Sequence, residues 1–107
     1  MQLPIRQLLE SRMHHVMARI TVKPEAAKAV ERILVELVTK SREEAGCVSY
    51  ELYQQAGAPH VFQTVEAWQE KANADAHMGT PHVGAAIAAA GAMFAVPPEI
   101  LAYAKLA

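Results

Sequence analysis

The chain has 107 residues, of which ten are basic and eleven are acidic, and its formal net charge is −1. This length corresponds to one domain. The charges form no Lys/Arg stripe, so we expect neither nucleic acid nor a membrane surface as a partner. The longest apolar run, residues 85–90, is too short to span a bilayer, and residues 1–13 lack the apolar region of a signal peptide. The lone cysteine, Cys47, excludes an internal disulfide and indicates a cytoplasmic protein with a buried, inert thiol.

Residues 1–13 are predicted to be an N-terminal extension to a domain that covers residues 14–107. Pro4 suits the first position of a short helix with an apolar stripe. The alternative is a mobile segment that precedes a second candidate start at Met13.

The first half of the domain is predicted to contain a strand and a helix. Apolar and polar residues alternate over residues 16–22, which indicates a strand. Pro24 then opens a helix, because the missing N–H of proline does no harm in a first turn. Apolar residues follow at helical spacing: Val30, Ile33, Leu34, Leu37 and Val38. We expect Gly46 to end this helix as its C-terminal cap.

The second half is predicted to contain a hairpin, two short helices and a last strand. The expected elements are strands over residues 47–55 and 60–68 joined by a turn at 55–59, a helix over 70–78 stopped by Gly79, a helix from Pro81 to about Ala90 capped by Thr80, and a strand over 99–105.

The resulting order, βαββααβ, predicts an α+β, ferredoxin-like fold with a four-stranded antiparallel sheet. The helices would cover one face of the sheet and leave Met17, Arg19 and Thr21 on the bare face. Two such bare faces packed together would form a dimeric α+β barrel, so we expect a homodimer.

Glu66, Trp68 and Phe62 have the same parity on the third strand and therefore share one face. Phe62 makes that face apolar, so a carboxylate there must be paired, hydrogen-bonded or protonated. Glu66 could have a structural role, in which it caps the first turn of a helix or bonds a backbone amide. The alternative is that it takes part in catalysis.

His77 ends the short helix among small residues, where its ring would reach a cavity between helix and sheet. It would accept a proton from a phenolic substrate or orient that substrate, since imidazole titrates near neutrality. The alternative is a histidine bonded to the last helix carbonyls. His82, in the first turn of the next helix, would bond a substrate oxygen, cover the helix start or contact a dimer partner.

No metal site is expected, because His77 and His82 are five residues apart with Pro81 between them, which is not the spacing of a helical metal pair. Tyr50 and Tyr53 point to opposite faces of the second strand, so one of them belongs to the core. Met78 and the alanines of the third helix would either leave space for a ligand or pack tightly.

Three motifs in this order resemble the antibiotic biosynthesis monooxygenase (ABM) domain. They are Gly46-Cys47-x-x-Tyr50-Glu51-Leu52, Glu66-x-Trp68 and Ala76-His77-x-x-x-Pro81-His82. The resemblance covers roughly His15 to Lys105. It implies a small dimeric α+β barrel, in a family of which many members oxygenate quinols or polyketides without a cofactor.

The expected function is therefore a cofactor-independent monooxygenase acting on a quinol or another electron-rich aromatic with O₂. His77 would be the base and Glu66 a second proton-handling group. The expected pocket residues are Phe62, Trp68, His82, Tyr50 and Met78. The alternatives are an isomerase of a small sugar-like metabolite and a non-enzymatic small-molecule-binding dimer. As neither His77 nor Glu66 belongs to the aliphatic core, Glu66→Gln and His77→Ala are expected to preserve stability.

Haem degradation is disfavoured by the same resemblance. Haem-degrading relatives use an asparagine, a tryptophan and a haem-ligating histidine, and the corresponding positions here hold Ala18, His77 and Ile87.

Overall fold

The computed structural model describes Ile5 and residues 12–107. The elements are β1 (His14–Thr21), η1 (Pro24–Ala26), α2 (Ala27–Ser41), β2 (Cys47–Gln55), β3 (Ala58–Trp68), α3 (Lys71–Met78), α4 (Pro81–Ala90), η2 (Gly91–Met93) and β4 (Glu99–Tyr103). The predicted order βαββααβ is confirmed. Both alternatives for residues 1–13 fall largely outside the described residues.

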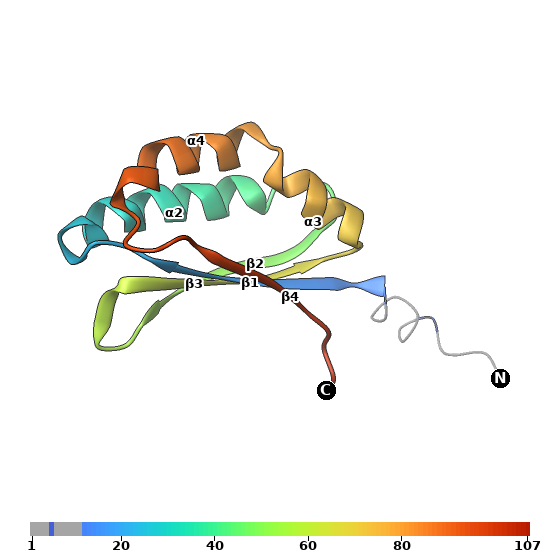
Figure 1. Cartoon of the computed structure of the whole chain (residues 1–107). Helices are drawn as coiled ribbons and strands as arrows, with labels where there is room; N and C mark the ends of the chain where they lie inside the picture. Colours follow the sequence, from blue (N-terminus) through green and yellow to red (C-terminus); the bar gives the residue numbers. More distant parts are fainter. Residues whose placement is uncertain (1–4, 6–11) are drawn as a thin grey trace.

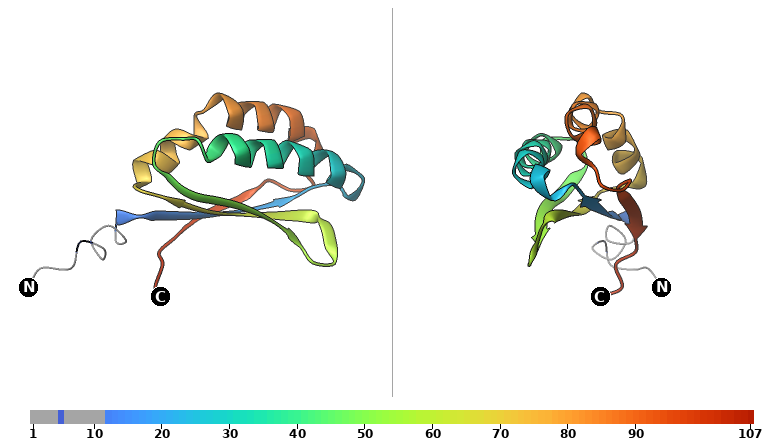
Figure 2. Two further views of the ribbon diagram at one scale, coloured as in Figure 1. Left: turned by 180° about the vertical axis from the view of Figure 1, so that it is seen from behind. Right: turned by 60° about the vertical axis from the view of Figure 1, so that its left-hand side comes forward.

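The four strands form one antiparallel sheet in the order β2-β3-β1-β4, and α2, α3 and α4 all lie over the same face (Figures 1 and 2). The predicted α+β, ferredoxin-like class is confirmed. β2 and β3 pair as a hairpin through Gly57, whose φ of 79° suits a tight turn. α2 and α4 run side by side above the sheet, and α3 covers the end of the sheet near the start of β1 (Figure 1).

The larger apolar core lies between α2 and the sheet. The buried residues of this cluster are Ile20, Val22, Val30, Leu34, Phe62 and Ala90. Val22 and Val30 are both fully buried. Burying one such side chain contributes about 1.5–3 kcal/mol, so the helical stripe predicted for α2 accounts for much of its attachment to the sheet.

The prediction that Gly46 caps the first long helix is wrong. α2 ends at Ser41, and residues 42–46 form turns, with the Glu44 N–H bonded to the Ser41 carbonyl at 3.1 Å. The Arg42 side chain bonds β2, since its Nε donates to the Tyr50 carbonyl at 2.9 Å. Gly46 instead reverses the chain before β2, with a φ of 81°. The early end of α2 places Glu44 in a turn rather than on a helix face.

Other boundaries also differ by one or two residues. β1 covers His14–Thr21 instead of residues 16–22. β3 begins at Ala58, β4 ends at Tyr103, and α3 begins at Lys71 with Glu70 as its N-cap. Glu70 and Asn73 form a reciprocal capping box, which satisfies the first backbone N–H groups of α3.

The sheet face opposite the helices is bare in the part of the chain that the structure describes (Figure 1). Arg19 is exposed there, as the alternation of β1 predicts. Met17 pairs in register with Val65 of β3 and Leu101 of β4, and Leu101 is 56% exposed. No helix in the described ranges is both long enough and apolar enough to cross a bilayer.

Candidate functional site

A cavity of about 530 Å³ lies between the sheet and the three helices. Its walls are mostly apolar, with contributions from Val16, Ile20, Leu34, Val83, Ile87 and Phe94. Its buried polar lining consists of Thr64 and Glu66 from β3, the ring of His77 from α3, and Tyr50 from β2. An apolar chamber with a few converging polar groups is the usual form of a small-molecule site.

Glu66 is a buried carboxylate with one donor on each oxygen. The Thr64 hydroxyl donates to Oε2 at 2.7 Å, and the indole N–H of Trp68 donates to Oε1 at 3.1 Å. Thr64 is itself fixed, since its Oγ1 accepts from the backbone N–H of Ala18 at 3.1 Å. Glu66 thus neither caps a helix nor bonds a backbone amide. It is a carboxylate held in one orientation at the cavity wall.

His77 lies in a cage of aromatic rings and is only 4% exposed. Its ring centroid is 4.9 Å from that of Trp68 and 5.4 Å from that of Tyr50. Its Nδ1 lies 2.5 Å from Glu44 Oε2. The predicted alternative, a ring bonded to helix carbonyls, is therefore not what the structure contains.

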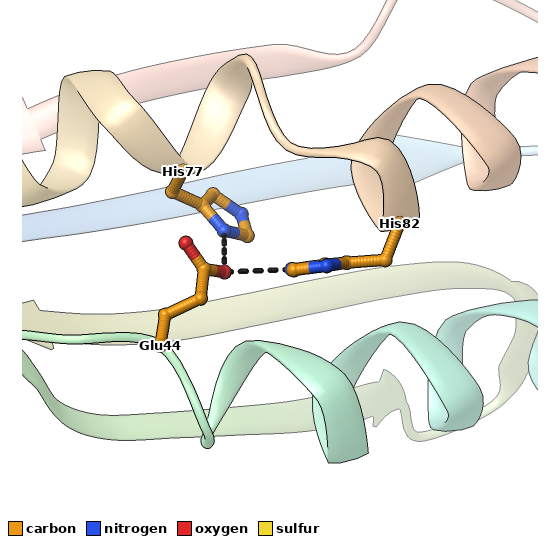
Figure 3. A group of neighbouring side chains, drawn as sticks. All are labelled: Glu44, His77 and His82. Carbon is orange, nitrogen blue, oxygen red and sulfur yellow. Dashed lines mark hydrogen bonds and ion pairs between the residues drawn. The ribbon is translucent and has the colours of Figure 1, made fainter.

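His82 approaches the same carboxylate oxygen from α4, with its Nε2 2.8 Å from Glu44 Oε2 (Figure 3). Thr80 caps α4 by accepting from the Val83 N–H at 3.4 Å, as predicted, and its hydroxyl donates to the His77 carbonyl at 2.8 Å. The break between α3 and α4 is thereby fixed, which brings two histidines from separate helices onto one carboxylate.

Sequence reasoning missed Glu44. It follows Arg42 and Glu43 in a charged run with no local feature that distinguishes it from a solvated helix face. Because α2 ends early, the Glu44 side chain can reach His77 of α3. Thr64 was not among the predicted site residues, although strand parity places it on the same face as Glu66.

The predicted pocket residues divide into three groups. Tyr50 and Met78 line the cavity together with His77 and Glu66. Phe62 and Trp68 do not line it: both are fully enclosed and support the wall from behind. His82 lies on the far side of His77, beside a groove of about 200 Å³ between α2 and α4.

The hydrogen bonds to Glu44 select the tautomer of His77. An ionised carboxylate only accepts hydrogen bonds, so Nδ1 of His77 must carry the proton in a neutral ring. Nε2 of His77 then has a free lone pair. No described residue bonds this nitrogen, and the His77 ring lines the cavity. The arrangement is an imidazole oriented by a carboxylate, which is the geometry that general bases use.

Burial raises the pKa of the Tyr50 hydroxyl well above its usual range, and the charges of Glu66 and Glu44 raise it further. The Ser41 side chain opposes this rise in pKa, but Tyr50 stays protonated at neutral pH. Burial also raises the pKa of the Cys47 thiol, with further contributions from Glu44 and Glu66 that Arg42 opposes. Cys47 is accordingly a poor nucleophile.

Residues 13–89 match the family model of antibiotic biosynthesis monooxygenases. This match covers more than half of the chain, so the protein belongs to the antibiotic biosynthesis monooxygenase family. The sequence resemblance to the ABM domain is confirmed.

Two curated proteins illustrate the relationship. The chain is 34% identical over 67 residues to a Mycobacterium tuberculosis protein named "Putative monooxygenase Rv0793". The aligned region covers 63% of this chain and 65% of the relative. The chain is 30% identical over 88 residues to the uncharacterized protein sll1783 of Synechocystis sp., covering 82% of this chain and 60% of that protein. The chain thus spans only 60% and 65% of the lengths of these two relatives.

Solved structures show the same fold over nearly the whole chain. PA3566 from Pseudomonas aeruginosa superposes with a TM-score of 0.84 at 34% identity, covering 92% of this chain and 98% of that one. Rv0793 superposes with a TM-score of 0.82 at 29% identity, covering 89% and 96%.

Proposed function

We propose that the protein is a monooxygenase that oxidises a quinol or another electron-rich aromatic with O₂ and needs no cofactor. The observation that carries this proposal is His77, a histidine at the wall of an apolar cavity whose Nδ1 is anchored to Glu44 at 2.5 Å. Membership of a monooxygenase family supports the reaction class.

The reaction begins with proton transfer. His77 Nε2 accepts the proton of a phenolic hydroxyl, and Glu44 stabilises the imidazolium that forms. The resulting phenolate is electron-rich and reduces O₂ itself. Addition of oxygen to the ring and loss of water convert one hydroquinone and one O₂ into one hydroxyquinone and one water.

Two further groups have roles in this scheme. Tyr50, which stays protonated, donates to the developing oxyanion. Glu66 is the second proton-handling group, because its two donors leave lone pairs on both oxygens at the cavity wall. The apolar lining excludes water and so protects the oxygenated intermediate from side reactions.

The proposal includes a homodimer formed through the bare sheet face, in which two sheets would close a barrel. It is supported by the exposed apolar residues of β4 that pair with His15 and Met17 on that face: Leu101 is 56% exposed and Tyr103 45%. Light scattering at micromolar concentration should give twice the chain mass, and a monomer mass would exclude the dimer. We also infer a cytoplasmic location from the single cysteine.

Oxygen uptake with hydroquinones, anthrones and naphthols tests the activity. Wild type is expected to consume O₂ with at least one of these classes, and His77→Gln, which approximates the ring's volume, should lose at least about a hundredfold in rate. His60→Gln is the matched control, because His60 lies on β3 but does not line the cavity. No uptake with any class would reject the monooxygenase in favour of an isomerase or a binding protein.

A further inference from the structure

We propose that Glu44, His77 and His82 form a binding site for a first-row divalent transition metal of the zinc type. The proposal about binding stands on the geometry of these three side chains. A second part, which rests on the proposed function, is that metal binding removes His77 as the cavity base.

The ligand set fits such an ion. One ligand atom from each residue can be chosen so that all three atoms lie within 4.8 Å of one another. Two imidazole nitrogens and one carboxylate oxygen are the donors of open zinc sites, which keep a further position for water. The side chains are 5% exposed for His77, 13% for Glu44 and 17% for His82, so the site is largely shielded from solvent.

The site is assembled from three separate segments that are already fixed. Glu44 lies in the turn after α2, His77 in the last turn of α3, and His82 in the first turn of α4 (Figure 3). Pre-formed convergence reduces the ordering cost of binding.

To admit an ion, Glu44 has to move. Its Oε2 lies 2.5 and 2.8 Å from the two ring nitrogens, whereas tetrahedral ligands about 2.1 Å from an ion are about 3.4 Å apart. The carboxylate must therefore withdraw by somewhat under 1 Å. No described residue bonds its Oε1, so little opposes this shift.

The charge of the cluster also favours a cation. Among the described residues, the only ion-pair partners of Glu44 are the two histidines, which carry no charge when neutral. The neighbouring Arg42 pairs with Glu51 at 2.8 Å instead. The largely buried carboxylate thus has no permanent cation beside it, and a divalent ion would supply one.

Metal binding and base catalysis exclude each other at His77. When Nδ1 binds the ion, the proton of the neutral ring moves to Nε2. Nε2 then donates into the cavity and no longer accepts a proton. An ion at this site would inhibit the proposed oxygenation without entering the cavity.

Metal titration of the tag-free full chain, stripped with a chelator, tests the site. Zn²⁺ calorimetry and the visible absorption of Co²⁺ should both report one ion per chain. Glu44→Gln and His82→Gln should each weaken binding at least tenfold, while circular dichroism verifies that both variants fold. His60→Gln should bind as wild type. Absence of binding by wild type, or unchanged binding in both cluster variants, would overturn the proposal. The double variant His14→Gln/His15→Gln tests the adjacent histidines of β1 as another site. Loss of binding in that variant, with binding kept in the cluster variants, would also overturn the proposal.

The same titration separates this inference from the proposed function. Binding is measured without substrate, so one ion per chain in a protein that consumes no O₂ would support the site and reject only the monooxygenase. In an active protein, Zn²⁺ should inhibit O₂ uptake, and the Zn²⁺ concentration that halves the rate should equal the concentration that half-fills the site. Full activity of the zinc-loaded protein would overturn the exclusion at His77.

Discussion

His77 Nδ1 and Glu44 Oε2 lie 2.5 Å apart although the two residues are 33 positions apart in the chain. Glu44 belongs to the turn that ends the first long helix, and His77 to the last turn of α3. Their contact fixes the ring of a cavity histidine and determines which of its nitrogens bonds the carboxylate.

Glu44→Gln should reduce turnover about 10- to 1,000-fold while KM changes little. The amide can present an N–H to Nδ1, which favours the opposite tautomer and places a proton on Nε2. Steady-state kinetics with the best substrate measure this effect. Glu43→Gln is the control, because Glu43 is exposed and adjacent in sequence. Equal rates in the two variants would mean that Glu44 does not orient the base.

His77→Ala should lower the free energy of unfolding by about 2–4 kcal/mol, because it leaves a cavity between Tyr50 and Trp68. The packing thus argues against the sequence-based expectation that this variant preserves stability. Glu66→Gln should cost no more than about 1 kcal/mol, since the amide keeps an acceptor for the Trp68 N–H. Urea unfolding of both variants decides the matter, and equal midpoints for His77→Ala and wild type would show that the ring packs loosely.

Tyr50 should make stability fall at high pH. Burial raises its pKa in the folded state above the ordinary value of 10.0. The stability due to the neutral hydroxyl is therefore fully present below pH 10.0 and is lost as the pH rises above that value, at up to about 1.4 kcal/mol per pH unit. Melting temperatures between pH 8 and 11 should fall less in Tyr50→Phe than in Tyr53→Phe, whose tyrosine is 58% exposed in the native protein. Parallel curves would refute the assignment.

Gly46→Ala should destabilise the protein more than Gly57→Ala does. Both glycines have positive φ values, 81° and 79°, so each alanine carries a similar backbone cost of about 1–2 kcal/mol. A Cβ at Gly46 would also meet the side chain of Asn73 at 2.2 Å, whereas a Cβ at Gly57 meets nothing within 4 Å. The difference between the two unfolding free energies measures this clash, and a difference of zero would contradict the packing of Asn73 against the turn.

The fold was predictable because its signals are local and repeated. Alternation marked β1 and the hairpin, and the apolar stripe of Val30, Leu34 and Val38 marked α2. The end of α2 was not predictable, because residues 42–45 contain no helix breaker. The helix ends where Arg42 bonds the Tyr50 carbonyl, and such a long-range contact leaves no local pattern.

The site was predictable only in part. His77 and Glu66 were found because a histidine after small residues and a carboxylate on an apolar strand face are both unusual. The convergence of His77 and His82 on one carboxylate was missed, because spacing along a single helix says nothing about two helices joined by a sharp turn. Glu44 carries no local signal at all.

The central claim is that His77 presents an unprotonated Nε2 to the cavity, and ¹⁵N NMR of the imidazole rings tests it most directly. In metal-free protein at neutral pH, the spectrum should show His77 with its proton on Nδ1, and addition of 1-naphthol should shift the Nε2 resonance. His60 should show no change. A proton on Nε2, or a His77 resonance that 1-naphthol leaves unmoved, would contradict the claim.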